Sequence, residues 1–170
     1  DIGCSEYTIG FDTACNTALD CIDKLRDTMQ SHERCSVVEV MGRHAGHLAL
    51  NVGCACGATA ILLPEREIDF ETDVIEKMRL GRIKGRNHHI IIVAEGYGSA
   101  QVVADRIHDA TGIDTRLTIL GHIQRGGSPT SQDRVMGTRM GYAAVIALEE
   151  GKSKRVVALR SGSVIDIDIE

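Results

Sequence analysis

Short apolar runs alternate with helical patterns along almost the whole chain, and this alternation restricts the fold more than any other feature. The run Ile90 to Ala94 contains no polar residue, which is typical of a strand buried on both faces. Between Asp12 and Met29, apolar residues recur instead at the spacing of an amphipathic helix. Alternating strands and helices are the pattern of βαβ units, so the sequence predicts an α/β fold with a largely parallel sheet covered by helices.

The expected elements follow one another with short connections. The predicted strands are 35–41, 60–63, 90–94, 114–120 and 155–159. The predicted helices are 12–29, 44–56, 73–84, 99–111 and a long helix that begins near Pro129 and ends at Glu150. The tail from Val164 to Glu170 alternates apolar and acidic residues, so it is either an edge strand or the start of a further element.

Composition places the chain among globular proteins. A content of 43% hydrophobic and 25% charged residues argues against disorder, and the longest apolar stretch, Leu48 to Leu63, is too interrupted to span a membrane. A net charge of −5 and only 3% aromatic residues argue against nucleic-acid binding. No C-x-x-C pair occurs, which favours free thiols in a reducing cytoplasm at Cys4, Cys15, Cys21, Cys35, Cys54 and Cys56.

Three loops that follow predicted strands carry the side chains best suited to ligand chemistry, because ligands of parallel sheets gather at the carboxyl ends of strands. The first loop holds Met41, Gly42 and Arg43, where glycine permits close backbone approach and the guanidinium can face an anion. A helix that begins near Ala45 would add its positive end. In the second loop, Glu95 could accept hydrogen bonds from ligand hydroxyls or simply face solvent.

The third loop, Leu120 to Pro129 (LGHIQRGGSP), is the densest in polar groups. A histidine, an amide, an arginine and flexible glycines ahead of a helix are the components of a phosphate or sugar-phosphate site. Arg34 and Arg116 lie at the opposite ends of their predicted strands. They therefore either serve the pocket of a neighbouring subunit or are ordinary surface arginines.

Two further groups of residues are less informative. His44 and His47 are three positions apart without carboxylate or cysteine partners nearby, which favours surface or packed histidines over metal ligands. The segment Lys84 to His89 gathers cations behind a predicted helix, where the helix end itself favours positive charge. A second anion site is the alternative there.

The chain resembles bacterial-type phosphofructokinases over nearly its whole length. The matching stretches are YTIGF (7–11), SVVEVMGR (36–43), LGHIQRGGSP (120–129), DR (133–134) and RMG (139–141). The resemblance implies the three-layer, Rossmann-like parallel-sheet architecture of the family's sugar-phosphate half. It also implies a glycolytic, cytoplasmic, homotetrameric 6-phosphofructokinase that transfers a phosphoryl group from Mg²⁺-bound ATP to the 1-hydroxyl of fructose 6-phosphate. A pyrophosphate-dependent enzyme and a non-catalytic phosphate-sensing module of the same fold remain alternatives.

The resemblance further implies a role for each matched position. Arg43 would stabilise the transferring phosphoryl group, Glu95 would hold sugar hydroxyls, and Arg34 and Arg116 would reach the 6-phosphate bound in an adjacent subunit. The whole set of implied fructose 6-phosphate ligands is Arg34, Met41, Gly42, Arg43, Glu95, Arg116, His122, Ile123, Gln124 and Arg125.

An effector site for ADP or phosphoenolpyruvate is also implied by the resemblance. The family commonly has a metal-associated Glu where this chain has Thr59, and a Lys where it has Asn87. These departures put metal-assisted ADP activation in doubt, while anion binding could survive. The implied effector residues are Arg26, Gly57, Lys84, Arg86 and His88.

Finally, the resemblance implies a division of the chain and a missing part. Residues 1–10 would end the nucleotide-binding half, 11–123 would form the fructose 6-phosphate domain, and 124–170 would return to the nucleotide-binding half. Asp1 aligns with the second Asp of the family's Thr-Ile-Asp-Asn-Asp motif, which makes it a candidate magnesium ligand and places the catalytic base upstream. We therefore expect this chain alone to be inactive and to expose the apolar side chains of Met136, Met140, Val145 and Leu148.

Overall fold

The chain forms two compact units in the computed structural model, which describes residues 3–29 and 34–169. The larger unit comprises Ala14–Gly127, and the smaller comprises Asp1–Thr13 with Ser128–Glu170. Each unit is described by itself below. The functional roles expected for residues 1–10, 11–123 and 124–170 stay a prediction, because compactness alone does not assign a role.

A four-stranded parallel sheet forms the centre of the larger unit and confirms the predicted α/β fold class. Its strands are β1 (Arg34–Val40), β2 (Ala60–Leu62), β3 (His88–Ala94) and β4 (Asp114–Ile119), in the spatial order β2-β3-β1-β4. The register sets Val40 opposite Ala94, and Glu39 opposite Ile119. The carboxyl ends of β1, β3 and β4 therefore meet at one edge of the sheet.

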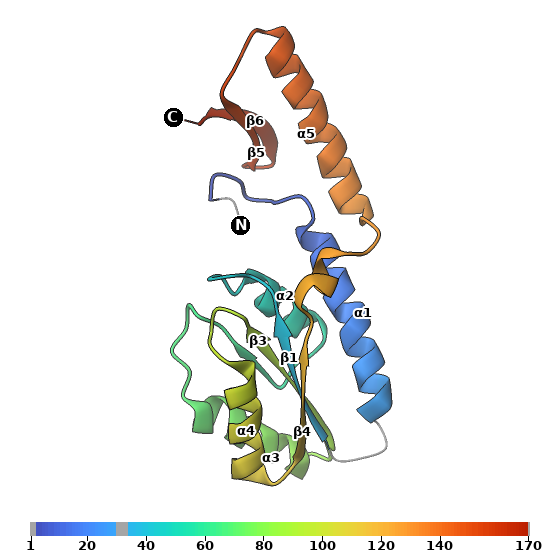
Figure 1. The fold of residues 1–170 in the computed structure, drawn as a ribbon, viewed down its shortest axis with the longest axis vertical. Helices are drawn as coiled ribbons and strands as arrows, with labels where there is room; N and C mark the ends of the chain where they lie inside the picture. The colour runs from blue at the N-terminus through green and yellow to red at the C-terminus, as the bar shows by residue number, and fades with distance from the viewer. Residues whose placement is uncertain (1–2, 30–33, 170) are drawn as a thin grey trace. The chain divides into compact units, whose positions relative to one another are not determined.

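Helices cover both faces of this sheet (Figure 1). The helices are α1 (Phe11–Met29), α2 (His47–Ala55), α3 (Glu76–Ile83) and α4 (Ala100–Thr111), with a π-helical turn η1 (Glu71–Ile75) and a 3₁₀ turn η2 (Gly121–Arg125). α4 has a serine N-cap, Ser99, and ends at Gly112 in the left-handed conformation, φ 69°. The predicted helix 44–56 begins three residues late because Gly42 and Ala45 close a tight turn first, Ala45 N–H donating to the Gly42 carbonyl at 2.9 Å.

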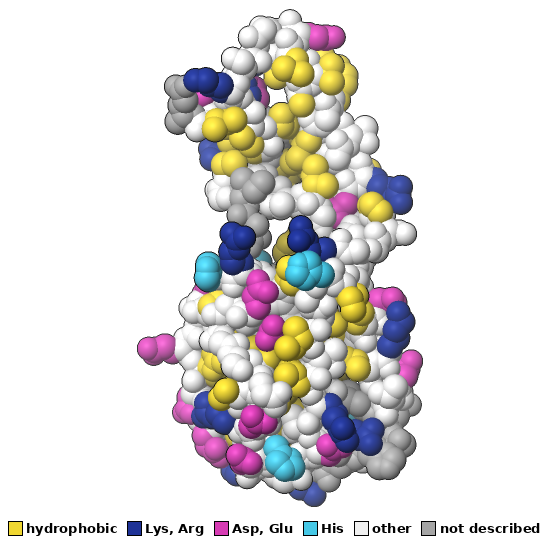
Figure 2. All heavy atoms as spheres, viewed as in Figure 1, with side chains coloured by type: hydrophobic (Ala, Val, Ile, Leu, Met, Phe, Trp, Pro, Cys, Tyr) yellow, Lys and Arg dark blue, Asp and Glu magenta, His cyan; other side chains and the backbone are white. Residues whose placement is uncertain are grey.

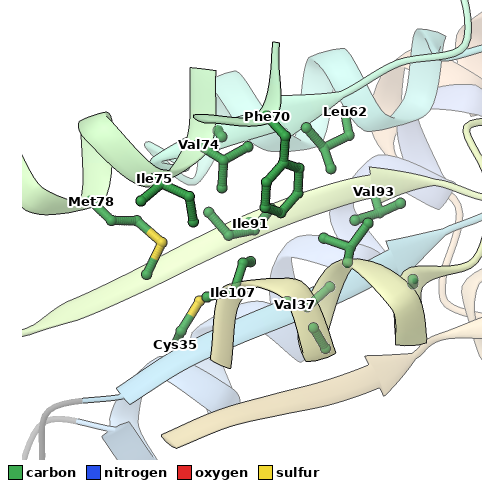
Figure 3. Close-up of a cluster of buried hydrophobic side chains, with 14 of the residues drawn as sticks. Cys35, Val37, Leu62, Phe70, Val74, Ile75, Met78, Ile91, Val93 and Ile107 are labelled. Carbon is green, nitrogen blue, oxygen red and sulfur yellow. The ribbon is translucent and has the colours of Figure 1, made fainter. Parts of the chain in front are cut away.

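The core of the larger unit lies between the sheet and the helical layer of η1, α3 and α4 (Figure 3). Alternate residues of β1 and β3 point into it, because successive strand residues face opposite sides of a sheet. The labelled members of this cluster are Cys35, Val37, Leu62, Phe70, Val74, Ile75, Met78, Ile91, Val93 and Ile107. Val38, Val40, Ile90 and Ile92 are equally buried from the other strand face, so the run 90–94 is enclosed on both faces as predicted.

The smaller unit combines a hairpin with the long helix α5 (Ser131–Glu149). Strands β5 (Arg155–Arg160) and β6 (Ser163–Asp168) pair antiparallel, with Arg160 opposite Ser163. The ambiguous tail is therefore a strand. α5 starts after a Thr130 N-cap, whose hydroxyl accepts from Asp133 N–H at 3.3 Å.

Asp133 ties the N-terminal segment to α5 within this unit. Only 3% exposed, its carboxylate accepts hydrogen bonds from the Tyr7 hydroxyl, from Gly10 N–H at 2.8 Å and from both the N–H and the hydroxyl of Thr13. Burial alone would raise the pKa of Asp133, but these hydrogen bonds outweigh it and lower the pKa to about 2. Burial and the bond to Asp133 raise the pKa of Tyr7.

One part of the expectation for α5 is wrong. Val145 and Leu148 are exposed as predicted, at 53% and 71%, and Met140 is half-buried. Met136, however, is only 6% exposed, and its sulfur lies 3.7 Å from the Arg139 guanidinium one turn away. Met136 therefore belongs to the core of this unit and not to its open apolar face.

Candidate functional site

The three loops singled out in the sequence meet at the carboxyl edge of the parallel sheet. Backbone hydrogen bonds continue the strand pairing into the loops: Glu95 N–H donates to the Val40 carbonyl at 3.0 Å, and Leu120 N–H to the Glu39 carbonyl at 3.1 Å. Near the level where the strands end in Figure 1, Figure 2 shows basic and histidine side chains beside acidic ones. The structure thus brings together the loops that carry Met41–Arg43, Glu95 and His122–Arg125.

The loop after β1 is held from both sides through three successive N–H groups. Met41 N–H donates to Gln124 Oε1 at 2.8 Å. Gly42 N–H donates to Glu95 Oε1 at 3.3 Å, and Arg43 N–H donates to the same oxygen. Side chains from the loops after β3 and β4 therefore fix the backbone of the loop between them.

The loop after β1 has positive φ angles at two successive residues, Gly42 and Arg43, and most side chains disfavour such a conformation. Gly42 has φ 154°, and a Cβ there would overlap the carbonyl oxygen of Ala45. Arg43 has φ 55°, in the left-handed region that costs energy for a non-glycine residue. Gly42 therefore closes the turn that presents an exposed arginine, and the close approach of a ligand to its backbone stays a prediction.

Gly96 is a site-building residue that sequence reasoning did not select. A Cβ at Gly96 would overlap the carbonyl group of Arg43 and crowd the Cα of His44. The loop after β3 can therefore lie against the loop after β1 only because residue 96 has no side chain. The available signal was a glycine directly after Glu95, the first residue beyond a buried strand.

Glu65, in the segment after β2, was also missed. Its Oε1 accepts a hydrogen bond from Gly46 N–H at 2.7 Å, and this bond lowers the pKa of Glu65. The N–H group that precedes α2 is therefore occupied by a carboxylate of the same chain. The helix expected near Ala45 begins at His47, and a role of its positive end in ligand binding stays a prediction.

The third loop folds as the 3₁₀ turn η2, in which one polar side chain is buried and its neighbours are exposed. Gln124 is 1% exposed, whereas His122, Ile123 and Arg125 are exposed. In a 3₁₀ helix, residues three apart are eclipsed, so His122 and Arg125 project from the same side. Two groups able to bind phosphate thus lie one above the other beside the carboxyl edge of the sheet.

Glu39 adds a second carboxyl group near Glu95. It lies on β1, one residue before the strand ends, and is half-buried. Burial raises the pKa of Glu39, the charge of Glu95 raises it further, and a hydrogen bond with the Ala100 backbone opposes both. The carboxyl edge of the sheet therefore carries two neighbouring carboxyl groups, those of Glu39 and Glu95, in addition to the exposed guanidinium of Arg43.

Arg34 and Arg116 lie at the opposite, amino edge of the sheet, as their positions in the strands predicted. Both contact Asp114: the Arg34 Nε is 3.3 Å from its Oδ2, and the Arg116 Nε is 3.1 Å from its Oδ1. Arg34 is the first residue of β1, and Arg116 is the third residue of β4, opposite Ser36, so both strands run on beyond these arginines before the three loops begin. Their assignment to an adjacent subunit's site remains a prediction.

Residues of the implied effector site also lie toward this amino edge. Gly57, φ 63°, follows α2, and Arg26 donates to the neighbouring Cys56 carbonyl. The next residues lead into β2, where Thr59 N–H donates to the Ile90 carbonyl at 2.8 Å. Lys84 and Arg86 lie between α3 and β3, and His88 is the first residue of β3; all three side chains are exposed.

Thr59, which stands where the family commonly has Glu, has a partner of its own. Its hydroxyl oxygen lies 3.2 Å from Nδ1 of the buried His89. Binding of a nucleotide or phosphoenolpyruvate at these residues remains a prediction.

The described ranges, 3–29 and 34–169, contain neither a cluster of metal ligands nor a membrane-spanning helix. There, no three His, Cys, Asp or Glu side chains are grouped so that they could hold a metal ion. His44 and His47 are exposed, and Asp1, the candidate magnesium ligand, lies outside the described residues. Within the same ranges, every helix is too short or too polar to cross a membrane.

None of the six cysteines is in a disulfide in the structure. Cys15, Cys35 and Cys56 are buried, and burial raises the pKa of Cys35 to about 12. The Cys35 thiol therefore stays protonated and serves packing in the core.

Comparison with known proteins agrees with this geometry. The sequence model of the phosphofructokinase family, described as "Phosphofructokinase", matches residues 1–148. The chain belongs to the phosphofructokinase family. It is 53% identical over 170 residues to the ATP-dependent 6-phosphofructokinase of Brevibacillus brevis, and 54% identical over 171 residues to that of Clostridium botulinum strain Hall. The alignments cover the whole chain but only 53% of each relative, so the chain spans about half their length.

Solved phosphofructokinases have the same fold as this chain. The structure from Saccharomyces cerevisiae superposes with a TM-score of 0.93 at 32% identity, over 99% of this chain and 24% of that one. The T-state structure from Pichia pastoris gives a TM-score of 0.85 at 33% identity, over 96% and 20%. A pyrophosphate-dependent phosphofructokinase from Marinobacter aquaeolei, at 22% identity and a TM-score of 0.75, shares the fold.

Proposed function

We propose that the protein containing this chain is an ATP-dependent 6-phosphofructokinase, and that this chain supplies its fructose 6-phosphate site. The observation that carries the proposal is the meeting of three strand-end loops, with Met41–Arg43 held between Glu95 and Gln124. An exposed arginine, an exposed carboxylate and the paired His122 and Arg125 suit a ligand with both hydroxyl and phosphate groups.

Glu95 would orient the sugar. Both hydrogen bonds that the structure gives its carboxylate go to Oε1, from Gly42 and Arg43 N–H. The carboxylate is thereby fixed in place, and its exposure allows Oε2 to accept a hydrogen bond from a sugar hydroxyl. A carboxylate held this way orients its ligand with little loss of side-chain freedom.

Arg43 would stabilise the phosphoryl group during its transfer. Phosphoryl transfer is accelerated mainly by positioning and by neutralising charge on the equatorial oxygens. Arg43 is fixed at its backbone by the same Glu95 and exposed at its side chain, so its guanidinium can meet that charge. His122 and Arg125 would hold the 6-phosphate.

The phosphoryl donor is proposed to be ATP. The more similar curated relatives are named ATP-dependent, whereas the pyrophosphate-dependent structures are only 22–23% identical and support the fold alone. Magnesium would accompany ATP and neutralise its phosphates. The described residues offer no cluster of ligands for it, so no step of the reaction is assigned to the ion.

Assembly, regulation and location complete the proposal. In a homotetramer, Arg34 and Arg116 would reach the 6-phosphate of an adjacent subunit, which accounts for their distance along the strands from the three loops. ADP or phosphoenolpyruvate would bind the cationic residues at the amino edge. As a glycolytic enzyme, the protein would act in the cytoplasm. These points rest on the family membership and on charge placement.

A coupled assay on the complete protein tests the proposed function. Fructose 6-phosphate and Mg²⁺ are supplied with either ATP or pyrophosphate, and fructose 1,6-bisphosphate is followed through aldolase. Turnover with ATP at least tenfold above turnover with pyrophosphate supports the proposal. Turnover with pyrophosphate alone would reassign the donor, and no product with either donor would point to a non-catalytic phosphate-sensing protein.

A further inference from the structure

Gln124 is the most deeply buried polar side chain near the three loops. It is 1% exposed, although it lies in η2 between the exposed Ile123 and Arg125. Its amide oxygen accepts the Met41 N–H at 2.8 Å, across 83 positions of sequence. The resemblance implied that Gln124 is one of the sugar-phosphate ligands, but such burial keeps it from direct contact with a ligand at the surface of this edge.

The orientation of the amide follows from its partner. A backbone N–H can only donate, so the atom that faces Met41 must be the oxygen of Gln124 and not its nitrogen. The nitrogen, Nε2, is buried and has no hydrogen-bond partner among the described residues. Among the described residues, only the oxygen of this amide therefore has a partner.

A buried amide whose nitrogen has no hydrogen-bond partner destabilises the folded state. An unpaired buried donor costs free energy, and an unbranched apolar side chain of similar size, such as Met, would avoid that cost. Packing alone does not explain a Gln at this position. The feature that does require an acceptor here is the Met41 N–H, the first of the three N–H groups that fix the loop carrying Arg43.

We propose that Gln124 is a positioning residue, which holds the Met41 N–H from the β4 side while Glu95 holds Gly42 and Arg43 from the β3 side. The two acceptors together keep Arg43 in its left-handed backbone conformation, φ 55°. Gln124 thus acts on the reaction through Arg43 and not by contact with the sugar phosphate. The catalytic consequence rests on the proposed function, whereas the structural consequence does not.

Two variants of the complete protein separate positioning from packing. Gln124→Met fills the same space but removes the acceptor, so the Met41 N–H loses its partner. Gln124→Glu, whose protonated form is favoured by burial at this position, keeps a carbonyl acceptor and a donor in the places of the amide groups. Gln101→Met makes the same chemical change on the exposed face of α4 and is the matched control.

Hydrogen exchange of backbone amides is the first readout, because it needs no activity. We expect Gln124→Met to accelerate exchange at Met41, Gly42 and Arg43 at least tenfold, Gln124→Glu to restore most of the protection, and the control to match wild type. Unchanged exchange in Gln124→Met would overturn the inference. Greater loss in Gln124→Glu, which keeps the acceptor, than in Gln124→Met, which lacks it, would show that the acceptor does not protect the loop and would overturn the inference as well. If Gln124→Met fails to fold, retained protection and turnover in Gln124→Glu support the inference, and loss of either contradicts it.

Kinetics provide the second readout. We expect Gln124→Met to lower kcat at least tenfold with a smaller change in KM for fructose 6-phosphate. Combined with Arg43→Ala, it should add less than twofold to the loss caused by Arg43→Ala alone, because both changes remove the same contribution. Multiplicative losses would show that Gln124 acts independently of Arg43, and a loss confined to KM would indicate direct ligand contact; either result would overturn the inference. If the wild-type protein itself forms no fructose 1,6-bisphosphate, the proposed function fails, and the exchange result still decides the role of Gln124.

Discussion

At the scale of single residues, the candidate site depends on two glycines and two acceptors that together position one arginine. Gly42 closes the turn and Gly96 lets the neighbouring loop approach it, while Glu95 and Gln124 hold the backbone between them. The side chain of Arg43 itself stays exposed and available to a ligand. In the proposed function, the chemistry is assigned to Arg43 and the positioning of Arg43 to its neighbours.

Arg43→Ala should lower kcat of the complete enzyme by a factor of about 10² or more, as for other groups that stabilise transition-state charge. The loss follows from removing the guanidinium while leaving the backbone turn intact. Steady-state kinetics with saturating ATP measure it. Near-normal kcat with only a raised KM would show that Arg43 merely holds the substrate.

Gly96→Ala tests the close approach of the two loops. Its Cβ would overlap the backbone of Arg43, and overpacking of this kind costs about 1–3 kcal/mol. We expect a lower melting temperature and weaker fructose 6-phosphate binding by calorimetry. Gly137→Ala, where a Cβ on α5 meets nothing within 4 Å, is the control and should leave binding unchanged. Equal binding in both variants would contradict the loop arrangement.

At the scale of elements, the strands and most helices could be predicted, because their apolar periodicity is local. For the site loops, only their positions at the ends of the strands could be predicted, and the contacts between them could not. Nothing in the sequence shows that Met41 N–H pairs with Gln124, since that contact joins residues 83 positions apart and depends on strand register. Similarly, the late start of α2 follows from the turn between Gly42 and Ala45 and from the hydrogen bond between Gly46 N–H and Glu65. The second contact joins residues 19 positions apart and exists only in the folded chain.

Asp133 joins α5 to the N-terminal segment, and its contribution should depend on pH. Its folded pKa of about 2 lies below the model-peptide value of 3.8, so its stabilisation is present above about pH 4 and is lost as pH falls toward 2. The pKa difference corresponds to about 2 kcal/mol. Asp133→Asn should therefore lower the free energy of unfolding of the complete protein at pH 7, and by clearly less at pH 3.

Urea unfolding at the two pH values, with Asp109→Asn on the exposed face of α4 as control, measures this difference. A destabilisation by Asp133→Asn that stays constant between pH 7 and pH 3 would show that the charge of Asp133 does not contribute.

At the scale of the whole molecule, the chain is about half the length of its curated relatives. Its candidate ligand-binding residues lie at both edges of one sheet. The carboxyl edge holds the three loops, and the amino edge holds Arg34 and Arg116 with Asp114. In the proposed tetramer, the arginines at the amino edge of one subunit complete the sugar-phosphate site of another. This division predicts cooperativity, because one site then belongs to two subunits.

Arg116→Ser should weaken fructose 6-phosphate binding by about 1.5–3 kcal/mol, the value of a hydrogen bond to a charged group, and should change the Hill coefficient. Arg79→Ser, which also removes an exposed arginine from an ion pair, is the control and should alter neither quantity. Normal sugar-phosphate binding by an obligate monomer of the complete protein would rule out a shared site.

The central claim is that the loops after β1, β3 and β4 form a fructose 6-phosphate site, and ligand-dependent hydrogen exchange tests it most directly. The complete protein is compared with and without saturating fructose 6-phosphate, and with fructose as the ligand that lacks phosphate. We expect slower exchange in three peptides, those spanning 41–46, 95–99 and 121–127, with fructose 6-phosphate but not with fructose. Protection confined to other parts of the chain, or no difference between the two sugars, would contradict it.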